Sequence, residues 1–233
     1  VLRPYIQQAN PLCSNQLDTN ESEGNSVNAI GFAEVRFLKD FKFTSTNSVS
    51  SEETRSTITT NPWFGQYASQ NGAITVEHDR TWSYNYQQLL TWHHQFDQHE
   101  VDAMLGHEYY RRRYYVLYGD KTNMYTFPSN DMASAVNTGS TNSYRNDYNT
   151  EGWFGRVQYN YDQKYFASMS YRRDASSRFA PENRWGNFWS FGGAWMISKE
   201  KFFNVSWIDE LKIKASYGEQ GNDNIQDQYG FDQ

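Results

Sequence analysis

Regular alternation of apolar and polar residues on both sides of a short turn is the feature that most constrains this fold. Every second residue is aromatic, aliphatic or glycine up to Asp162-Gln163, and the alternation resumes in the same phase after it. The apolar set comprises Trp153, Gly155, Val157, Tyr159 and Tyr161, followed by Tyr165, Ala167, Met169 and Tyr171. Because successive side chains of a strand point to opposite faces, this pattern predicts an antiparallel hairpin with one apolar face.

The same hairpin pattern recurs along the chain. Strands are predicted over 29–38 and 41–49, around a turn at Lys39-Asp40, and on both sides of a turn at Asp97-Gln98. A last pair of strands flanks the connection 198–210. We therefore expect an all-β, antiparallel fold of about eight strands.

The predicted connections are sorted by length. Turns within the hairpins are tight, whereas the polar stretches 50–72, 119–150 and 173–185 between hairpins are expected to be long loops. Alternate connections of an up-and-down sheet emerge at opposite ends, so the short turns and the long loops would be separated. Outer-membrane β-barrels have this asymmetry, with short periplasmic turns and longer external loops.

Composition fits strands that face lipid better than it fits a protein with a solid core. Mean hydropathy is -0.90, yet aromatic residues make up 18% of the chain. Many of the rings flank the predicted turns, as in the aromatic girdle of a membrane barrel, although aromatic residues also favour strands in general. The net charge of -6 argues against a nucleic-acid partner, since phosphate groups require a basic surface.

Six segments carry a resemblance to a known family. They read, in chain order, FGRVQYNY, RRDASSRF, NRWGNFWS, AWMISKEKFF, SWIDELKIKASYG and GNDN. In order and spacing they resemble the β-barrel of the SusC/RagA-type TonB-linked outer-membrane transporters of Gram-negative bacteria. Two upstream segments, FAEVRFLKDFKFTST and DAMLGHEYY, fit the same pattern, so the resemblance extends over essentially the whole chain.

The resemblance implies a large barrel of the roughly 22-strand plugged class, driven by TonB through its plug and paired outside with a SusD-like lipoprotein. Residues 1–233 would form a central, partial barrel domain, and the plug, the TonB box and the closing strand are expected to lie outside this chain. The implied function is active import of oligomeric nutrients, oligosaccharides more than peptides, without catalysis. A soluble, aromatic-rich β-sandwich that binds glycans is the alternative, and a barrel enzyme would need a Ser/His pair that the sequence does not reveal.

External loops are where we expect contact with the substrate or the SusD-like protein. The candidates for this contact are Trp63, Tyr67, Tyr125, Tyr144, Arg145 and Tyr148. Arg111 and Arg113 share the phase of the presumed lipid face, about a dozen residues beyond a turn, and a strand crosses the bilayer in about 9–11 residues. They are candidates for contact with lipopolysaccharide; the alternative is a solvated strand above the membrane.

The remaining charged clusters favour structural roles. A network bracing the loop after the third hairpin is expected from Arg172, Arg173, Asp174, Arg178 and Arg184. His93 and His94 are strand neighbours that point to opposite faces, so they cannot bind one ion, and no metal site is expected. Asp223, Asn224 and Asp227 resemble a calcium patch but lack EF-hand spacing, so a turn is the better interpretation and no cofactor is expected.

Overall fold

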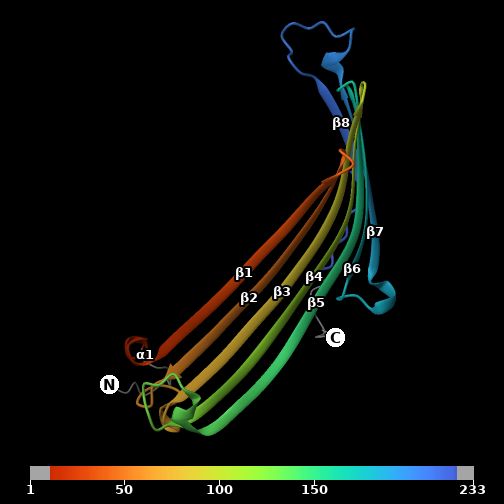
Figure 1. Ribbon diagram of the computed structural model, residues 1–233. Helices are drawn as coiled ribbons and strands as arrows, with labels where there is room; N and C mark the ends of the chain where they lie inside the picture. The colour runs from red at the N-terminus through yellow and green to blue at the C-terminus, as the bar shows by residue number, and fades with distance from the viewer. Residues whose placement is uncertain (1–10, 225–233) are drawn as a thin grey trace. The chain divides into compact units, whose positions relative to one another are not determined.

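A computed structural model describes residues 11–224, which form one antiparallel sheet of eight strands in the order β1 to β8 (Figure 1). Each strand pairs with its neighbour in the sequence, as an up-and-down sheet requires, so the predicted all-β architecture and strand number are confirmed. The strands are β1 Thr19–Phe37, β2 Phe41–Thr60, β3 Ala73–Phe96, β4 His99–Met124, β5 Ala135–Tyr161, β6 Tyr165–Ser176, β7 Trp185–Met196 and β8 Lys212–Gly218. Because a single sheet holds all the described strands, the two-sheet sandwich is wrong.

Helices are few and short. They are α1 Pro11–Leu17 and the 3₁₀ segments η1 Ala68–Gln70, η2 Met132–Ser134, η3 Pro181–Asn183 and η4 Ile197–Lys199. Among the described residues, no helix is both long enough and apolar enough to cross a membrane.

Two compact units divide the chain. The first contains the residues through Asn28, together with Ser50–Trp82 and Arg113–Asp147. The second contains Ala29–Val49, Ser83–Arg112 and the residues from Tyr148 onward. Strands β1 to β5 each contribute a part to both units, whereas β6, β7 and β8 belong to the second alone.

The third predicted hairpin has the register that its alternation requires. Asp162 and Gln163 both have φ near +50°, which is the left-handed conformation that tight hairpin turns use. Val157 lies opposite Met169, and in the next two pairings Met169 lies opposite Phe191 and Phe191 opposite Tyr217. The apolar residues of four consecutive strands therefore share one face.

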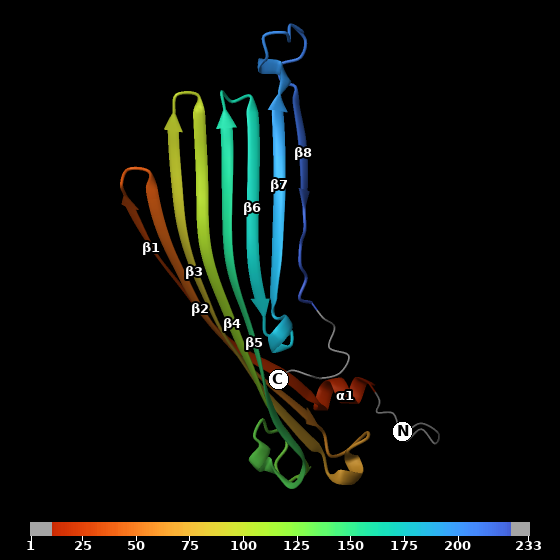
Figure 2. The same cartoon turned by 90° about the vertical axis from the view of Figure 1, so that its right-hand side faces the viewer.

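The tight turns of the first three hairpins lie at one end of the second unit, where Figure 2 shows them side by side. The three connections predicted as long loops are present but shorter than predicted, and the last spans 177–184. Residues 50–60 and most of 119–150 are strand, so these two connections shrink to 61–72 and 125–134. Composition suggested loops there because Ser, Thr and Asn are abundant on both faces. Pairing with neighbouring strands satisfies the backbone N–H and C=O groups of these residues. The surrounding sheet therefore overrides their weak intrinsic β-propensity.

A small hydrophobic core is present in the first unit. Ile74, Met124 and Ala135 are buried together, and Val76 and Phe127 pack against them with Met132. Gly72 has φ of +80°, and a Cβ at this position would lie 2.9 Å from the carbonyl oxygen of Thr60. The core and this turn join the ends of β3, β4 and β5 to the two connecting loops.

In the second unit the apolar face is open to its surroundings. Met196 is the one buried hydrophobic residue that the described part of this unit contains, whereas Val157 and Met169 remain 49% and 51% exposed. An apolar face of this kind is stable only when another apolar surface removes it from water, because exposed apolar area costs roughly 25 cal/mol per Å² in water. The sequence-based expectation of amphipathic strands without a solid core is therefore confirmed for this unit.

Aromatic and histidine rings form a continuous row along the turn end of the second unit. Neighbouring ring centroids lie between 4.8 and 6.5 Å apart. In order, the row contains Phe37, Phe41, Trp92, His94, Phe96, His99, Tyr161, Tyr165, Trp195 and Phe202. Its position agrees with a girdle at a membrane interface, and contact with lipid stays a prediction.

Candidate functional site

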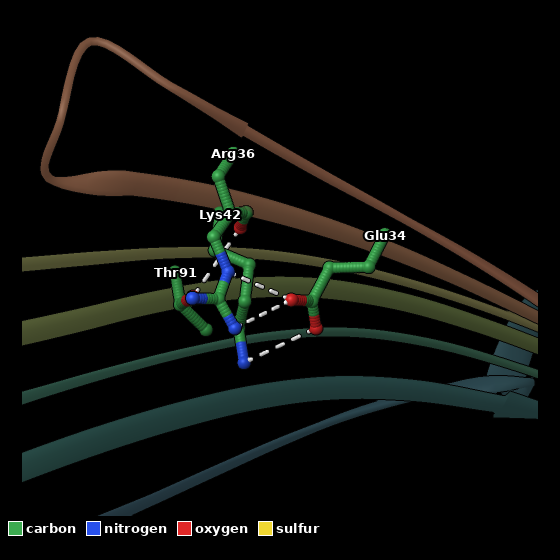
Figure 3. A network of polar contacts seen from close by, with 4 residues as sticks. All are labelled: Glu34, Arg36, Lys42 and Thr91. Atoms are coloured by element: carbon green, nitrogen blue, oxygen red, sulfur yellow. Dashed lines mark hydrogen bonds and ion pairs between the residues drawn. The ribbon is translucent and has the colours of Figure 1, made fainter.

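Charged side chains occupy the face of the second unit opposite the apolar one. On β1, Arg36 donates through Nε to Glu34 Oε1 at 2.9 Å, and Lys42 Nζ of β2 lies 3.6 Å from Glu34 Oε2. Thr91 of β3 donates from Oγ1 to the carbonyl oxygen of Lys42 at 3.3 Å, which extends the contacts to a third strand (Figure 3). This polar face is compatible with a water-filled interior.

Phe154 and Phe166 are aromatic residues on the polar face, and a cation covers each of them. The guanidinium of Arg172 lies 5.0 Å above the ring of Phe154, and Lys212 Nζ lies 3.9 Å from the ring centre of Phe166. Gly106 leaves the space that Phe154 fills, because a Cβ there would lie 2.3 Å from its ring carbons. These aromatic residues therefore do not expose a bare apolar patch on this face.

The two connecting loops of the first unit contain Trp63, Tyr67 and Tyr125. Trp63 and Tyr67 lie in a loop as predicted, and Tyr125 lies in a shorter loop than predicted. Trp63 packs edge-on against Phe127 with ring centroids 5.3 Å apart, which brings the two loops together. Trp63 and Tyr125 remain 57% and 69% exposed, so most of each side chain is free to contact another molecule.

Buried Asn61 fixes the loop that carries Trp63. Its Oδ1 accepts hydrogen bonds from the backbone N–H groups of Trp63 and Phe64 at 3.0 and 2.8 Å. Its Nδ2 donates to Asp18 Oδ1 at 2.7 Å, and its backbone N–H donates to the same oxygen at 2.8 Å. The exposed Trp63 ring is thus presented from a fixed backbone.

Tyr144 and Arg145 lie on β5 rather than in the predicted loop of about 30 residues. The ring of Tyr144 contacts that of Tyr114 at 6.3 Å, and the Arg145 Nε lies 3.6 Å from Asp147 Oδ1. Both side chains are mostly exposed. They are strand positions that keep accessible groups, not parts of an irregular loop.

Tyr148 lies in the second unit and is partly covered. Arg178 and Arg112 lie over its ring at 4.7 and 5.8 Å, and its hydroxyl donates to Asp223 Oδ2 at 2.5 Å. Ser176 Oγ donates to the same oxygen at 2.9 Å. The hydrogen bond from Tyr148, together with Ser176 and Arg178, holds the pKa of Asp223 below its usual range. These contacts attach the segment after β8 to the sheet.

Arg113 has a partner on the next strand. Its guanidinium donates through Nε and Nη2 to the two carboxylate oxygens of Asp147, at 3.1 and 3.3 Å. Arg111 lies two positions earlier on β4, at a site of the same phase. Arg113 was expected to contact lipopolysaccharide, but Asp147 neutralises its positive charge within the chain. Contact of Arg111 and Arg113 with the lipid stays a prediction.

Among the five residues expected to brace the loop after β6, Arg172 and Asp174 contact each other, and the other three have different partners. Arg172 bonds Asp174 at 2.7 Å and lies 3.6 Å from Glu108, whereas Arg173 lies over the ring of Trp185. Arg178 donates to the carbonyl oxygen of Asp223, and Arg184 to that of Phe179. Asn224 donates from its backbone to Asn222 Oδ1 at 2.9 Å; Asp227, the third residue of the considered calcium patch, lies outside the described residues.

Asp223 was not among the sequence-predicted contact residues for substrate or partner. It lies 75 positions after Tyr148, and only the fold shows that the two side chains meet. The aromatic residues of the loops, by contrast, could be recognised from composition.

No protein-family model matches the chain. TonB-dependent receptor SusC of Bacteroides thetaiotaomicron is 29% identical to it over 231 residues, which cover 95% of this chain and 22% of SusC. TonB-dependent receptor P3 of Formosa agariphila is 27% identical over 219 residues, covering 93% of this chain and 22% of P3. The chain thus spans about a fifth of the length of these curated relatives.

Solved structures share the fold. The structure of the RagAB peptide transporter matches with a TM-score of 0.85 and 24% identity, over 92% of this chain and 24% of that chain. A structure of the RagAB peptide importer in the 'open-open' state matches with a TM-score of 0.81 and 23% identity, over 89% of this chain and 23% of that chain. The resemblance to SusC/RagA-type TonB-dependent transporters is confirmed over most of the chain, and the sheet matches a segment of such a barrel.

Proposed function

We propose that this chain forms a segment of the wall of a TonB-dependent outer-membrane importer of oligomeric nutrients. In this proposal the eight strands contribute to a larger plugged barrel, and TonB acts through a plug formed by residues outside 1–233. The apolar face of the second unit contacts lipid, and the polar face lines a wet interior. The connecting loops of the first unit face outward.

The exposed apolar face carries this proposal. Val157, Met169, Phe191 and Tyr217 form a row across four paired strands. The described residues do not cover this row, and in a bilayer the hydrocarbon would. The similarity to TonB-dependent receptors over nearly the whole chain supports the same reading.

We further propose that oligosaccharides are the preferred substrates and that a SusD-like lipoprotein is the external partner. Trp63 and Tyr125 support this choice, because exposed rings offer flat surfaces on which the apolar faces of sugars stack. Peptides are the competing class, since the matched RagAB structures are those of a peptide transporter. Contact of Arg111 and Arg113 with lipopolysaccharide belongs to the same proposal.

Uptake by living cells tests the proposal. The host strain would carry a deletion of the transporter that contains this chain, complemented with the wild type, Trp63→Ala plus Tyr125→Ala, or Gln66→Ala. Gln66 is an exposed residue without a ring in the same loop as Trp63, so it serves as the matched control. Uptake of labelled oligosaccharides and oligopeptides would be measured with and without TonB.

We expect TonB-dependent oligosaccharide uptake that falls about tenfold in the double variant, if the two rings together contribute roughly 1.4 kcal/mol, and that is unchanged in Gln66→Ala. Uptake of peptides alone would show that the substrates are peptides rather than oligosaccharides, and it would leave the proposed importer function intact. Uptake of neither class, or uptake unaffected by loss of TonB, would contradict the proposed function.

A further inference from the structure

A cluster of metal-ligating side chains lies on the polar face of the hairpin formed by β3 and β4. His93 on β3 and Asp102 on β4 stand equally far from the turn at Asp97-Gln98, and His93 Nδ1 lies 2.8 Å from Asp102 Oδ1. Glu100 is two positions before Asp102 and therefore points to the same face. One ligand atom from each of the three side chains lies within 4.8 Å of the other two.

We propose that His93, Glu100 and Asp102 bind a divalent transition-metal ion of the Zn²⁺ class. The donor set is one imidazole nitrogen and two carboxylate oxygens, which Zn²⁺ accepts at about 2.0–2.2 Å, with water completing the tetrahedron. Ligands of such an ion are separated by roughly 3–3.5 Å, as follows from those bond lengths and tetrahedral angles. His93 Nδ1 and Asp102 Oδ1, at 2.8 Å, are slightly closer than two ligands of a bound ion, and no pair of the three ligand atoms is more than 4.8 Å apart. Small side-chain rotations can therefore bring all three to the distances of a loaded site.

Charge and accessibility favour an ion at this point. Glu100 and Asp102 place two negative charges on one face of a single strand, and a divalent cation relieves their repulsion. The side chains of His93 and Asp102 are 57% and 50% exposed, so an ion can reach them and the side chains can adjust. The imidazole distinguishes the site from an all-oxygen calcium or magnesium site.

A neighbouring strand orients one of the ligands. Asn160 of β5 donates from Nδ2 to Glu100 Oε2 at 2.8 Å, which leaves the other carboxylate oxygen available. Such outer hydrogen bonds fix the direction of ligating groups and strengthen metal sites. When the ion binds through Nδ1, it replaces the hydrogen bond between His93 and Asp102, and any proton on that nitrogen is released to water.

His94 provides an internal comparison. Its Nδ1 also lies 2.8 Å from a carboxylate, that of Asp40, so the pair has the same local geometry as His93 and Asp102. Its ring, however, stacks on Trp92 and makes a tilted contact with Phe96, and within residues 11–224 no further ligand joins this pair. The two adjacent histidines, which the sequence alone assigns only to opposite faces, therefore differ in the ligands around them.

Zinc titration of the intact, detergent-purified transporter tests the proposal. The protein would first be treated with a chelator, and bound Zn²⁺ would be measured by equilibrium dialysis and atomic spectroscopy. The variants are His93→Ala and the nearly isosteric Asp102→Asn, with His94→Phe as the control because it keeps a ring in the stack. Heat-modifiable electrophoretic mobility verifies that each variant retains a folded barrel.

The proposal predicts that His93→Ala and Asp102→Asn each weaken one Zn²⁺ site by at least about tenfold, while His94→Phe binds like the wild type. Calcium should not compete with Zn²⁺ for this site. Equal Zn²⁺ binding by folded His93→Ala and wild type would overturn it, as would an equal loss in His94→Phe. If His93→Ala does not fold, Zn²⁺ binding by Asp102→Asn is compared with that of the wild type instead, and equal binding would overturn the proposal.

Discussion

Met169→Arg is the substitution that most sharply separates a lipid-facing sheet from a water-facing one. Met169 lies in the middle of the apolar row, opposite Val157 on one side and Phe191 on the other. In water, an exposed surface position tolerates arginine with a change in unfolding free energy within about 0.5 kcal/mol. In a bilayer, the same charge would have to enter hydrocarbon.

The depth of Met169 follows from the ring row at the turn end. Tyr165 belongs to that row and precedes Met169 by four residues on β6. At a rise of roughly 3.3 Å per residue and a tilt of about 40°, four residues correspond to a depth of about 10 Å. Since the apolar band of such barrels is about 25 Å tall, Met169 lies close to its midplane.

Arginine at the midplane costs about 2–4 kcal/mol, which lowers the folding equilibrium constant roughly 30- to 900-fold. Ser168→Arg is the matched control, because Ser168 is the adjacent residue and points to the polar face. Its cost should stay below about 1 kcal/mol. The expected difference between the two variants is therefore at least about 1 kcal/mol.

Reversible urea unfolding of the transporter in lipid vesicles measures this difference. Folded and unfolded protein would be distinguished by heat-modifiable mobility, and the free energies compared at matched lipid composition. Equal destabilisation by Met169→Arg and Ser168→Arg would refute the assignment of the two faces, and a larger cost for Ser168→Arg would reverse it.

Three further outcomes follow from individual contacts. Gly106→Ala should lower stability by about 1–3 kcal/mol because its Cβ would collide with Phe154, and in a double-mutant cycle Phe154→Ala should recover part of this loss. Asn61→Ala should cost about 1–3 kcal/mol, since two backbone N–H groups lose their acceptor, and limited proteolysis should then cut within 61–72 more rapidly. The hydrogen bond from Tyr148 lowers the pKa of Asp223, so the ionised carboxylate stabilises the fold. This stabilisation is complete above the ordinary carboxyl pKa and is lost as the pH falls through the lowered pKa. The protection of the 219–224 amides against hydrogen exchange, relative to the intrinsic rate at each pH, should therefore fall below about pH 4, and Asp223→Asn should abolish this change; protection that changes in parallel in both proteins would contradict it.

The hairpins could be predicted because their two faces differ. Side chains repeat every two residues, so the phase of Val157 and Met169 on either side of the turn fixed both the register and the shared apolar face. The ends of the long strands could not be predicted in this way. Residues 50–60 and 135–150 are polar on both faces, and no period distinguishes a paired polar strand from a loop.

Contacts between distant segments were also beyond the sequence. The loop aromatics Trp63 and Tyr125 were recognisable by composition, but the hydrogen bond from Tyr148 to Asp223 depends on how the chain returns after β8. The cluster of His93 and Asp102 was missed for a related reason. His93 and His94 are neighbours in the sequence and point to opposite faces, whereas the imidazole of His93 and the carboxylate of Asp102 meet across the hairpin.

The alternation of lipid and water along β6 is the most direct test of the account. Nitroxide labels would be placed singly at residues 165–172 of the transporter, in a background free of other cysteines and with Cys13 replaced, and reconstituted in lipid vesicles. Accessibility to oxygen, which concentrates in hydrocarbon, would be compared with accessibility to a water-soluble nickel complex. The account predicts that odd positions are reached mainly by oxygen and even positions mainly by the nickel complex. Equal access of the nickel complex to both sets would mean that the apolar face of this sheet does not meet a membrane.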